Sequence, residues 1–439
     1  MERGVGSDGD EGTVQWRRAT LGEVVELKRG YDLPRRERVK GLIPLISSSG
    51  ITDSHAEAKA RGPGVVTGRY GTLGKVFYVP EDFWPLNTTL YVRDFKGNDP
   101  RFIAYFLSSI DFSAYSDKAA VPGLNRNHLH QALVDVPPLH EQRIIAHILG
   151  TLDDKIELNR RMNETLEEMA RALFKCWFVD FGPVRAKMEG RWRRGESLPG
   201  MPAELYELFP DRMVDSELGK IPAGWEVKEF GSLLEDVIGG DWGKEAPDGV
   251  HTEPVSIVRG TDLSSLSNGG TGSVPLRHTT KKKAERRRLR NGDIVIEVSG
   301  GSPTQSTGRS VLITQDVLER FQGTVVCASF CRRFRPHSWR EALIASGHLD
   351  FIYSIGKMWY YQLQSTGIAN FQTKQFLQEE SITWPGDELL DRFTEVIEPI
   401  ILLRARNDNI TLAAQRNLLL PMLISGKLQV TPRRQRQHD

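Results

Sequence analysis

Two stretches of sequence, WRRATLGEVVELKRG at residues 16–30 and WEVKEFGSLLEDVIGG at residues 225–240, follow one plan and decide the fold. Five features recur at a common offset of 209 residues: a tryptophan, a large apolar residue, a glycine, a pair of apolar residues and a second glycine. A repeat of this kind indicates that the chain builds one structural unit more than once. We therefore predict two related globular domains, which a length of 439 residues also favours.

The repeat extends through the rest of each half. The segments GPGVVTGRYG at 62–71 and NGDIVIEVSGG at 291–301 both read as a turn and a short β-branched strand that ends in glycines, and the strands KVFYV and SVLIT follow them. Each half then reaches a second glycine segment, VPGLNRNHL or STGIANFQT, and an extended stretch that runs into proline. The offset rises to 246 at the helices beyond, so the second copy carries about 37 additional residues.

Helical periodicity replaces the strand pattern after each proline. LHEQRIIAHILG predicts a short amphipathic helix that stops near Gly150, and Thr151 with Asp154 resembles a capping box for a second, longer helix. That helix carries a stripe spaced alternately by four and three residues, formed by Leu152, Ile156, Asn159, Asn163, Leu166, Ala170, Leu173 and Trp177. Such a heptad stripe favours a helical partner.

A second stripe near the end of the chain supplies that partner. It consists of Leu402, Ala405, Asn409, Leu412, Arg416, Leu419 and Leu423, and because Pro399 precedes it and Pro421 lies near its end, we expect a shorter, kinked helix. The simplest arrangement is that the two stripes pack against each other, with Asn163 and Asn409 fixing the register. The alternative is that each helix lies on its own globular domain.

These patterns predict an α+β protein in which two globular α/β domains, formed by an internal repeat, are joined by two long helices that pack against each other. The expected segments are a disordered N-terminus (1–15), a first domain (16–138), a central spacer helix region (139–181), a connector rich in Gly, Pro and Arg (182–224), a second domain (225–384), a C-terminal spacer helix region (385–430) and a basic tail (431–439).

Composition excludes several classes of protein. The chain has no apolar run long enough for a membrane span and no signal-peptide pattern, so we expect a cytoplasmic protein. Cys176, Cys327 and Cys331 lack the spacing of a zinc site, and no metal site is expected. The net charge of +1 gives no general basic field, so only local charge could attract nucleic acid.

Several longer segments resemble one known family. PPLHEQRIIAHILGTLDDKIELNRRMNETLEEMARALFKCWFVDFGPVRAKMEG closely resembles the central spacer region of the specificity subunits of Type I restriction-modification systems. LPGMPAELYELFPDRMVDSELGKIPAGWEV, the ending LLLPMLISGKLQV, and GTLGKVFYV, NTTLYV and GDIVIEVSGGSPTQSTGR are similar to other parts of the same family, so that the resemblance covers nearly the whole chain.

The resemblance implies a subunit that recognises double-stranded DNA and has no catalytic site. Its two target-recognition domains would each read one part of a split, asymmetric DNA site. Its two spacer helices would form an antiparallel coiled coil that relates the domains by a pseudo-two-fold axis and sets the distance between them. The same helices would bind two copies of the methylation subunit, with the restriction subunit joining the complex. S-adenosylmethionine, ATP and Mg²⁺ would then be bound by the partner subunits.

In the first domain, two loops carry candidate DNA contacts. TGRYGTLGK lacks the spacing and the Ser or Thr of a phosphate-binding loop, which leaves a glycine-rich loop with Arg69, Tyr70 and Lys75, or else a plain turn. GLNRNHLH places Asn125, Arg126 and Asn127 together. Since arginine can bond guanine and asparagine can bond adenine, a base-reading loop is chemically sensible; the alternative is an asparagine-rich turn that caps the next helix.

In the second domain, the basic run KKKAERRRLR and two later segments are the candidates. Phosphate contacts are expected from Lys281, Lys282, Lys283, Arg286, Arg287 and Arg309, because clustered charge acts without regard to base sequence, although a merely solvated face is the alternative. Asn370 and Gln372 could read bases. The spacer and partner contacts are expected at Leu152, Ile156, Asn163, Leu166, Leu173, Leu402, Asn409, Leu412 and Leu419.

No catalytic constellation can be assembled from the sequence. It has no Walker A loop, no Asn-Pro-Pro-aromatic motif, no HExxH and no GxSxG, and carboxylates such as Asp293 and Glu297 lack the lysine of a nuclease core. A self-contained DNA-modifying enzyme and a coiled-coil adaptor with two protein-binding heads remain the alternatives to a recognition subunit.

Overall fold

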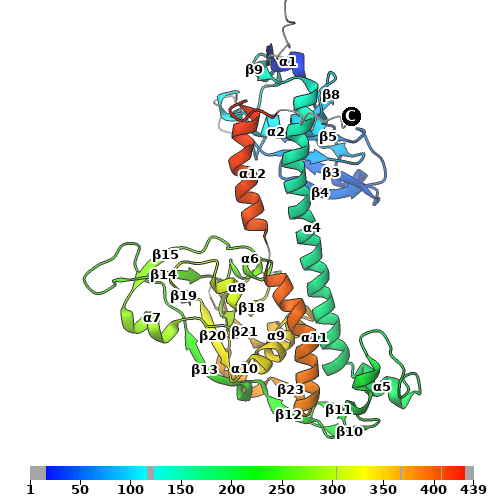
Figure 1. The fold of residues 1–439 in the computed structure, drawn as a ribbon, viewed down its shortest axis with the longest axis vertical. Helices are drawn as coiled ribbons and strands as arrows, with labels where there is room; N and C mark the ends of the chain where they lie inside the picture. Colours follow the sequence, from blue (N-terminus) through cyan, green and yellow to red (C-terminus); the bar gives the residue numbers. More distant parts are fainter. Residues whose placement is uncertain (1–15, 116–122, 303, 366–367, 407, 431–439) are drawn as a thin grey trace, which may run out of the picture. The chain divides into compact units, whose positions relative to one another are not determined.

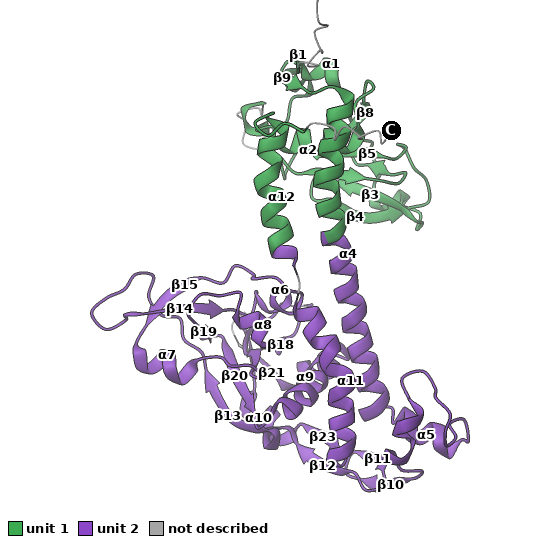
Figure 2. Cartoon of the chain, viewed as in Figure 1, with its two compact units in different colours: residues 1–155, 411–439 green, residues 156–410 purple. Residues whose placement is uncertain are grey.

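The computed structural model describes residues 16–115, 123–302, 304–365, 368–406 and 408–430, and these form a mixed α and β structure (Figure 1). The segments predicted as a disordered N-terminus and as a basic tail lie outside the described residues. The chain divides into two compact units, unit 1 with residues 1–155 and 411–439 and unit 2 with residues 156–410 (Figure 2). No described helix combines the length and the hydropathy that spanning a bilayer requires.

Unit 1 contains a globular head, residues 17–136, whose strands form one four-stranded and one three-stranded sheet. The four-stranded sheet has the order β2-β8-β5-β6, the three-stranded sheet has the order β4-β3-β7, and β1 pairs with β9. Its strands are β1 (Arg17–Thr20), β2 (Glu26–Arg29), β3 (Ile43–Ser47), β4 (Gly50–His55), β5 (Gly64–Gly68), β6 (Val76–Val79), β7 (Trp84–Pro85), β8 (Thr89–Asp94) and β9 (Leu133–Val136), and its helices are α1 (Leu21–Val24), α2 (Pro100–Ser108), α3 (Arg126–His130) and the 3₁₀ turns η1 (Arg35–Glu37) and η2 (Phe112–Tyr115).

Unit 2 contains a second head, residues 226–384, with the same plan. Its sheets have the orders β13-β20-β16-β18 and β15-β14-β19, β12 pairs with β23, and a further small sheet has the order β17-β22-β21. The strands are β12 (Glu226–Glu229), β13 (Leu234–Gly239), β14 (Glu253–Val258), β15 (Leu276–Thr279), β16 (Ile294–Glu297), β17 (Ser299–Gly300), β18 (Ser310–Leu312), β19 (Thr324–Cys327), β20 (Cys331–Pro336), β21 (Gln362–Ser365), β22 (Ile368–Phe371) and β23 (Ser381–Trp384). The helices are α6 (Leu263–Ser267), α7 (Lys281–Arg287), α8 (Gln315–Leu318), α9 (Trp339–Ser354), α10 (Thr373–Glu379) and the 3₁₀ turns η4 (Phe230–Leu233) and η5 (Lys357–Tyr361).

The predicted internal repeat is confirmed strand by strand. β2, β8, β5 and β6 of the first head correspond in order to β13, β20, β16 and β18 of the second, and the middle strands β3 and β14 each have one parallel and one antiparallel neighbour. The buried apolar runs VVT of β5 and IVI of β16 occupy equivalent central positions. The α+β class predicted from the repeat is therefore correct.

The long helix α4 (Leu139–Phe178) departs from the prediction, because it runs through Gly150 without a break. The Thr151 hydroxyl donates to the carbonyl of His147 one turn back and does not cap a new helix. Gly150 allows the Arg101 guanidinium to lie close to the helix, because a Cβ at this position would be only 2.6 Å from it. That guanidinium donates to the Gly150 carbonyl and pairs with Asp154. The proposed stop and capping box were wrong.

The C-terminal stripe is divided between two helices, α11 (Asp387–Ala405) and α12 (Asn409–Ile424). The prediction of one kinked helix was wrong in detail, since Pro399 lies inside α11, Pro421 lies inside α12, and the interruption falls between Ala405 and Asn409. In unit 2, α11 runs antiparallel to α4: Arg404 pairs with Glu167, and Phe393 packs against Phe178 with ring centroids 4.7 Å apart. In unit 1, Arg416 of α12 pairs with Asp153 of α4 at 2.8 Å.

The two helix arrangements considered above, packing of the helices against each other and packing of each helix on a head, occur together. Ile145 and Leu149 of α4 and Leu423 of α12 belong to the core of the first head, and Phe174 and Trp177 of α4 belong to the core of the second. Each unit therefore packs a helix pair directly onto its own head.

The connector is more ordered than its composition indicated. It holds α5 (Gly182–Met188), the 3₁₀ turn η3 (Ala203–Leu208) and the hairpin β10 (Met213–Ser216) and β11 (Gly219–Pro222). Trp192 and Phe209 are almost fully buried against Trp177 of α4 or against each other. Aromatic anchors thus outweigh the Gly, Pro and Arg content, because each one buries a large apolar area.

Candidate nucleic-acid interface

In the first head, the glycine turn between β5 and β6 lies against the segment that leads into α3. Tyr70 forms a β-bridge with Gly123, and the amide of Leu124 donates to the carbonyl of Arg69 at 2.9 Å. A Cβ on Gly123 would clash with the Tyr70 ring at 2.4 Å, so a glycine is needed for this contact. Two candidate segments that lie 55 residues apart are thereby brought together.

The side chains at this junction differ in what they can offer a ligand. Tyr70 is 40% exposed and its ring is covered by the Arg69 guanidinium at 4.5 Å, while Lys75, Arg126 and Asn127 are exposed. Asn125 is the N-cap of α3, and its side-chain oxygen accepts from the amide of Asn127. The capping alternative therefore holds for Asn125.

The second head repeats this junction with other residues. The loop between β16 and β18 contains β17, which pairs with β22 immediately before α10, so a glycine loop again meets the segment that precedes a short helix. Asn370 lies on β22, where its side-chain oxygen accepts from the Ser299 hydroxyl at 2.7 Å. Gln372 is the N-cap residue of α10, and its side-chain amide approaches the Asn370 carbonyl at 3.3 Å.

Arg309 is held by an ion pair within the second head. Its guanidinium forms two hydrogen bonds with the carboxylate of Glu297, at 2.9 and 2.7 Å, and Glu297 is almost completely buried. Asp293 is likewise buried and paired with Arg335. These carboxylates therefore serve as structural ion-pair partners at the two ends of β16.

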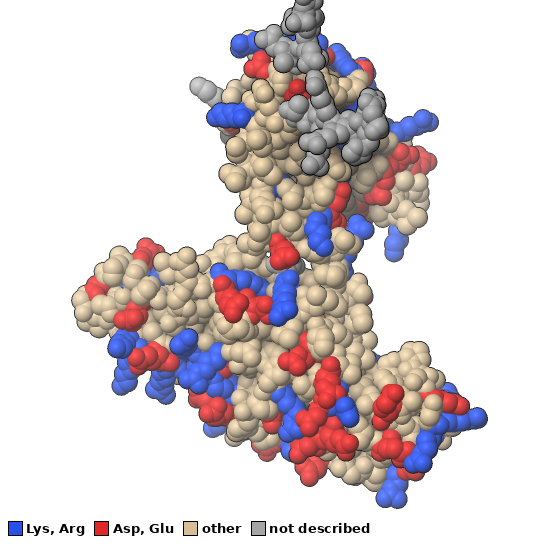
Figure 3. Space-filling model, viewed as in Figure 1, with Lys and Arg blue, Asp and Glu red and all other residues tan. Residues whose placement is uncertain are grey.

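The basic run forms α7 and the turn after it. Thr280 caps the helix, Ala284 is buried, Lys283 pairs with Asp241 at 3.1 Å, and Arg287 donates to the carbonyl of Gly239. Lys281, Lys282 and Arg286 are exposed and have no ion pair among the described residues. In Figure 3, Lys and Arg atoms gather in the region of unit 2 where α7 lies, with some Asp and Glu atoms among them.

Below α10, a buried carboxylate holds that helix to α9. Glu380 accepts hydrogen bonds from His348, Lys357 and Tyr361 at 2.6 to 2.8 Å. Burial alone would raise the pKa of Glu380, but these donors lower it to about 2. These hydrogen bonds hold the end of α10, the helix that follows the candidate junction, to α9 and η5.

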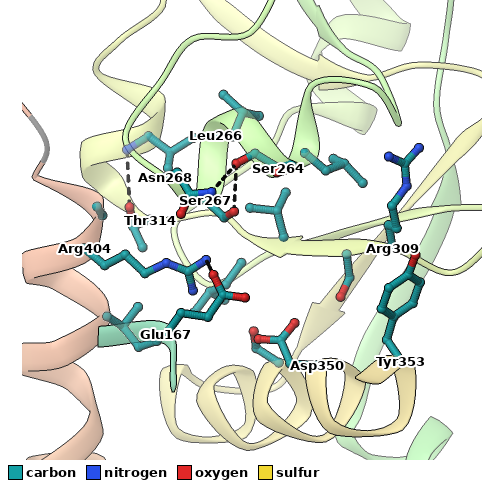
Figure 4. Close-up of a pocket in the computed structure, with 18 of the residues that line it drawn as sticks. Glu167, Ser264, Leu266, Ser267, Asn268, Arg309, Thr314, Asp350, Tyr353 and Arg404 are labelled. Carbon is teal, nitrogen blue, oxygen red and sulfur yellow. Dashed lines mark hydrogen bonds and ion pairs between the residues drawn. The ribbon is translucent and has the colours of Figure 1, made fainter. Parts of the chain in front are cut away.

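Unit 2 also contains a pocket of about 660 Å³ between α4, α6, β18, α9 and α11 (Figure 4). Glu167 bridges Arg171 and Arg404 across it, at 2.9 and 2.6 Å. Asp350 points into the pocket without a hydrogen bond or ion pair among the described residues, and burial raises its pKa to about 6. Within the described ranges no group of three or more His, Cys, Asp or Glu side chains is placed to hold a metal ion.

The predicted spacer residues are all at least partly buried. Asn163 and Leu166 are buried, and the others are half-buried: Leu152, Ile156, Leu173, Leu402, Asn409, Leu412 and Leu419. The polar contact between helices differs from the expected one, because Asn409 bonds to Asn159 at 2.9 Å and Asn163 instead donates to the carbonyl of Asn268 on the head. A heptad pattern gives the spacing of residues along one helix, but it does not show which residues of two neighbouring helices contact each other.

Sequence reasoning missed Ser299 and Leu363. Both lie opposite Asn370 in the small sheet, where Leu363 is 61% exposed. Only the pairing of β22 with β17 and with β21 identifies these two residues as neighbours of Asn370. Pairing between segments that are distant in the sequence is not visible in a local sequence pattern.

Residues 13–168 match the family described as Type I restriction modification DNA specificity domain. The Type I restriction enzyme HindI specificity subunit of Haemophilus influenzae is 31% identical over 209 residues, which cover 38% of this chain and 46% of that protein. The MjaIX specificity subunit of Methanocaldococcus jannaschii is 23% identical over 364 residues, which cover 79% of this chain and 74% of that protein. The match thus spans about half the length of the first relative and three quarters of the second.

A solved structure shows the same fold over nearly the whole chain. The crystal structure of a Type-I restriction-modification system S subunit from M. genitalium superposes with a TM-score of 0.58 at 13% identity, covering 96% of this chain and 98% of that one. The sequence matches and the shared fold agree with the duplicated heads described above: residues 13–168 match the Type I restriction modification DNA specificity domain, and the chain is similar to Type I specificity subunits over most of its length.

Proposed function

We propose that this chain is the DNA sequence-recognition subunit of a Type I restriction-modification complex, with no catalysis of its own. It reads a bipartite, asymmetric DNA site and directs the methylation and restriction subunits to that site. The observation that carries the proposal is the repeated junction of a glycine loop with the segment before a short helix, present once in each head and built from different side chains.

The repeat explains why such a site would be split and asymmetric. Two copies of one fold can approach two DNA segments in related ways, as the halves of a dimer do. The side chains at the two junctions differ, however. The junction of the first head carries Arg69, Tyr70 and Arg126, whereas the equivalent junction of the second head carries Ser299 and Asn370. Different hydrogen-bonding groups read different bases, so the two halves of the target would differ.

The helices are the proposed site for the protein partners. Among the described residues, α4 leaves large apolar side chains exposed along its length, including Leu158 at 59% and Met169 at 47%, and α12 leaves Leu418 exposed at 65%. Exposed apolar residues on a helix are typical of an interaction surface, and each unit offers such residues separately. Two methylation subunits and the restriction subunit would bind there, bringing S-adenosylmethionine, ATP and Mg²⁺ on their own sites, in the cytoplasm.

The test is genome-wide adenine methylation, measured by long-read sequencing in cells that carry this chain with its methylation partner and in cells that lack this chain alone. A split, asymmetric motif that disappears with the deletion is the expected result. An unchanged pattern in cells with an active methylation partner would favour the adaptor alternative. DNA modification by the purified chain with methyl donor, ATP and Mg²⁺ would favour the self-contained enzyme.

A further inference from the structure

The small sheet β17-β22-β21 of the second head has one buried and one exposed face. Gly300 pairs with Ala369, and Phe371 pairs with Gln362; Ala369 and Phe371 are buried, so these residues define the inner face. Ser299 pairs with Asn370, and Asn370 pairs with Leu363. Residues directly opposite in neighbouring strands lie on the same face, so these three side chains share the outer face.

Contacts and exposure agree with that assignment. The Ser299 hydroxyl reaches the side-chain oxygen of Asn370 at 2.7 Å, which requires both to be on one side of the sheet, and Leu363 is 61% exposed. Phe330, also 61% exposed, adjoins β17, because its carbonyl accepts from the amide of Ser299. The Asn370 amide and the apolar side chain of Leu363 thus lie together on one face of a small antiparallel sheet, and antiparallel β-ribbons fit the major groove of DNA.

The bond from Ser299 determines which end of the Asn370 amide is available. A hydroxyl that donates to the amide oxygen turns that oxygen toward β17, so the amide nitrogen, with two donor hydrogens, is the free end. In the major groove, guanine presents two acceptors, adenine and thymine present one each, and cytosine presents a donor. An asparagine that offers donors alone therefore suits guanine, whereas the usual bond to adenine also needs the oxygen.

We propose that the outer face of β17-β22-β21 reads one guanine in the half-site of the second head, with Asn370 donating to its O6 and N7 atoms and Ser299 acting as the positioning residue that fixes the amide. This inference rests on the proposed function. It adds to that function the base that is recognised, the two atoms of the base that are contacted, and the residue that orients Asn370. Leu363 supplies an apolar border that excludes water from one side of the contact.

The test compares the methylation motif written by the complete complex with wild-type chain and with single variants. Asn370→Asp replaces the donors by acceptors, so the guanine at one position is expected to give way to adenine or cytosine, whose exocyclic amines can donate. Ser299→Ala frees the amide oxygen, and the same position is expected to accept guanine or adenine. Ser299→Thr keeps the hydroxyl and is expected to retain guanine.

Binding of the purified complexes to duplexes that differ only at that position provides a second readout. The wild-type complex is expected to prefer guanine by at least about tenfold, and Ser299→Ala to reduce the preference over adenine to less than about threefold. Gln378→Glu, the same amide-to-acid change at an exposed position of α10, is the matched control and is expected to leave the motif unchanged.

The outcomes separate this inference from the proposed function. If the wild-type complex writes no split motif, the proposed function fails. If it writes one and neither Asn370→Asp nor Ser299→Ala alters a single guanine, the function stands and the inference is wrong. A loss of all methylation with Asn370→Asp is resolved by Ser299→Ala: relaxation at one guanine supports the inference, and an unchanged motif overturns it.

Discussion

At each of the two junctions, the hydrogen-bond partner of one asparagine determines what its side chain can bind. Asn125 and Asn370 occupy related positions after a glycine, and both were candidates for reading bases. In the structure, one caps a helix and the other is oriented by a serine 71 residues away. The type of residue was predictable, but the orientation of its amide depends on a neighbour that is distant in the sequence.

Asp350 leads to a prediction about pH. Its pKa is about 6 in the folded protein against an ordinary value of 3.8, so ionisation is less favourable in the folded state than in the unfolded state. For a carboxyl group with a raised folded pKa, the contribution to stability is full below pH 3.8 and is lost as the pH rises through 6. Asp350→Asn cannot ionise and should therefore stabilise the protein at pH 8 by about 2 kcal/mol, with little effect at pH 4.

Urea denaturation of wild type and Asp350→Asn at the two pH values checks this expectation. Asp215→Asn, a change at an exposed aspartate of the connector, is the control and should show no difference that depends on pH. Equal shifts at pH 4 and pH 8, or a loss of stability at pH 8, would show that Asp350 does not carry a cost of ionisation.

At the scale of elements, the helix α4 supports a matched pair of substitutions. Leu166 is 9% exposed where α4 meets the second head and α11, whereas Leu158, two turns earlier on the same helix, is 59% exposed. Leu166→Arg places a charge in an apolar contact and should lower the free energy of unfolding by about 3 kcal/mol. Leu158→Arg should change it by no more than about 0.5 kcal/mol.

Unfolding midpoints in urea, with circular dichroism to follow helix content, provide the measurement. Similar losses in both variants would mean that arginine is poorly tolerated anywhere on α4, and that burial of the stripe does not decide the result. Combining Leu166→Arg with Leu412→Arg should be worse than either change alone, because both side chains are at least half-buried.

The errors in the helix predictions have a common physical cause. Gly150 normally signals a helix end, yet here it admits the Arg101 guanidinium against the helix, a contact that depends on tertiary structure. The connector was expected to have limited order because of its composition, and it folds because Phe209 packs against Trp177 of α4 and Trp192 packs in turn against Phe209. Local patterns cannot show either partner.

For the whole molecule, charge distribution matters more than total charge. The net charge is only +1, so attraction to DNA must arise from local groups such as the exposed cations of α7. Replacing Lys281, Lys282 and Arg286 by glutamate should weaken binding of the complex to all DNA sequences alike. The slope of log affinity against log salt concentration should fall by up to about 3, since each phosphate contact contributes about 0.9.

Salt titrations with specific and unrelated duplexes measure this effect. The control places three glutamates in the connector, at the exposed residues Arg193, Arg212 and Lys220, and should leave the slope unchanged. A change of motif in the α7 variant, or an unaltered slope, would show that α7 does not bind phosphates.

The two-domain architecture was the most predictable feature, because the sequence contains the same pattern twice. Tryptophan and glycine positions at an offset of 209 predicted two heads, and the two sheet orders agree. The additional residues of the second copy were counted, but their fold was not predicted, because a segment without a counterpart offers no comparison. β17 and β22, on which the proposed reading of guanine depends, do have counterparts in the first head, at the Tyr70–Gly123 junction.

The pairing of β1 with β9 and of β12 with β23 has a consequence for inheritance. Each head begins and ends on two adjacent strands, so the chain leaves a head beside the place where it entered. A stretch of gene between those strands can therefore be exchanged for a homologous one without altering the path of the chain on either side. Recombination within one gene would then give a cell lineage a new DNA target in a single event, while the surfaces used for assembly stay the same.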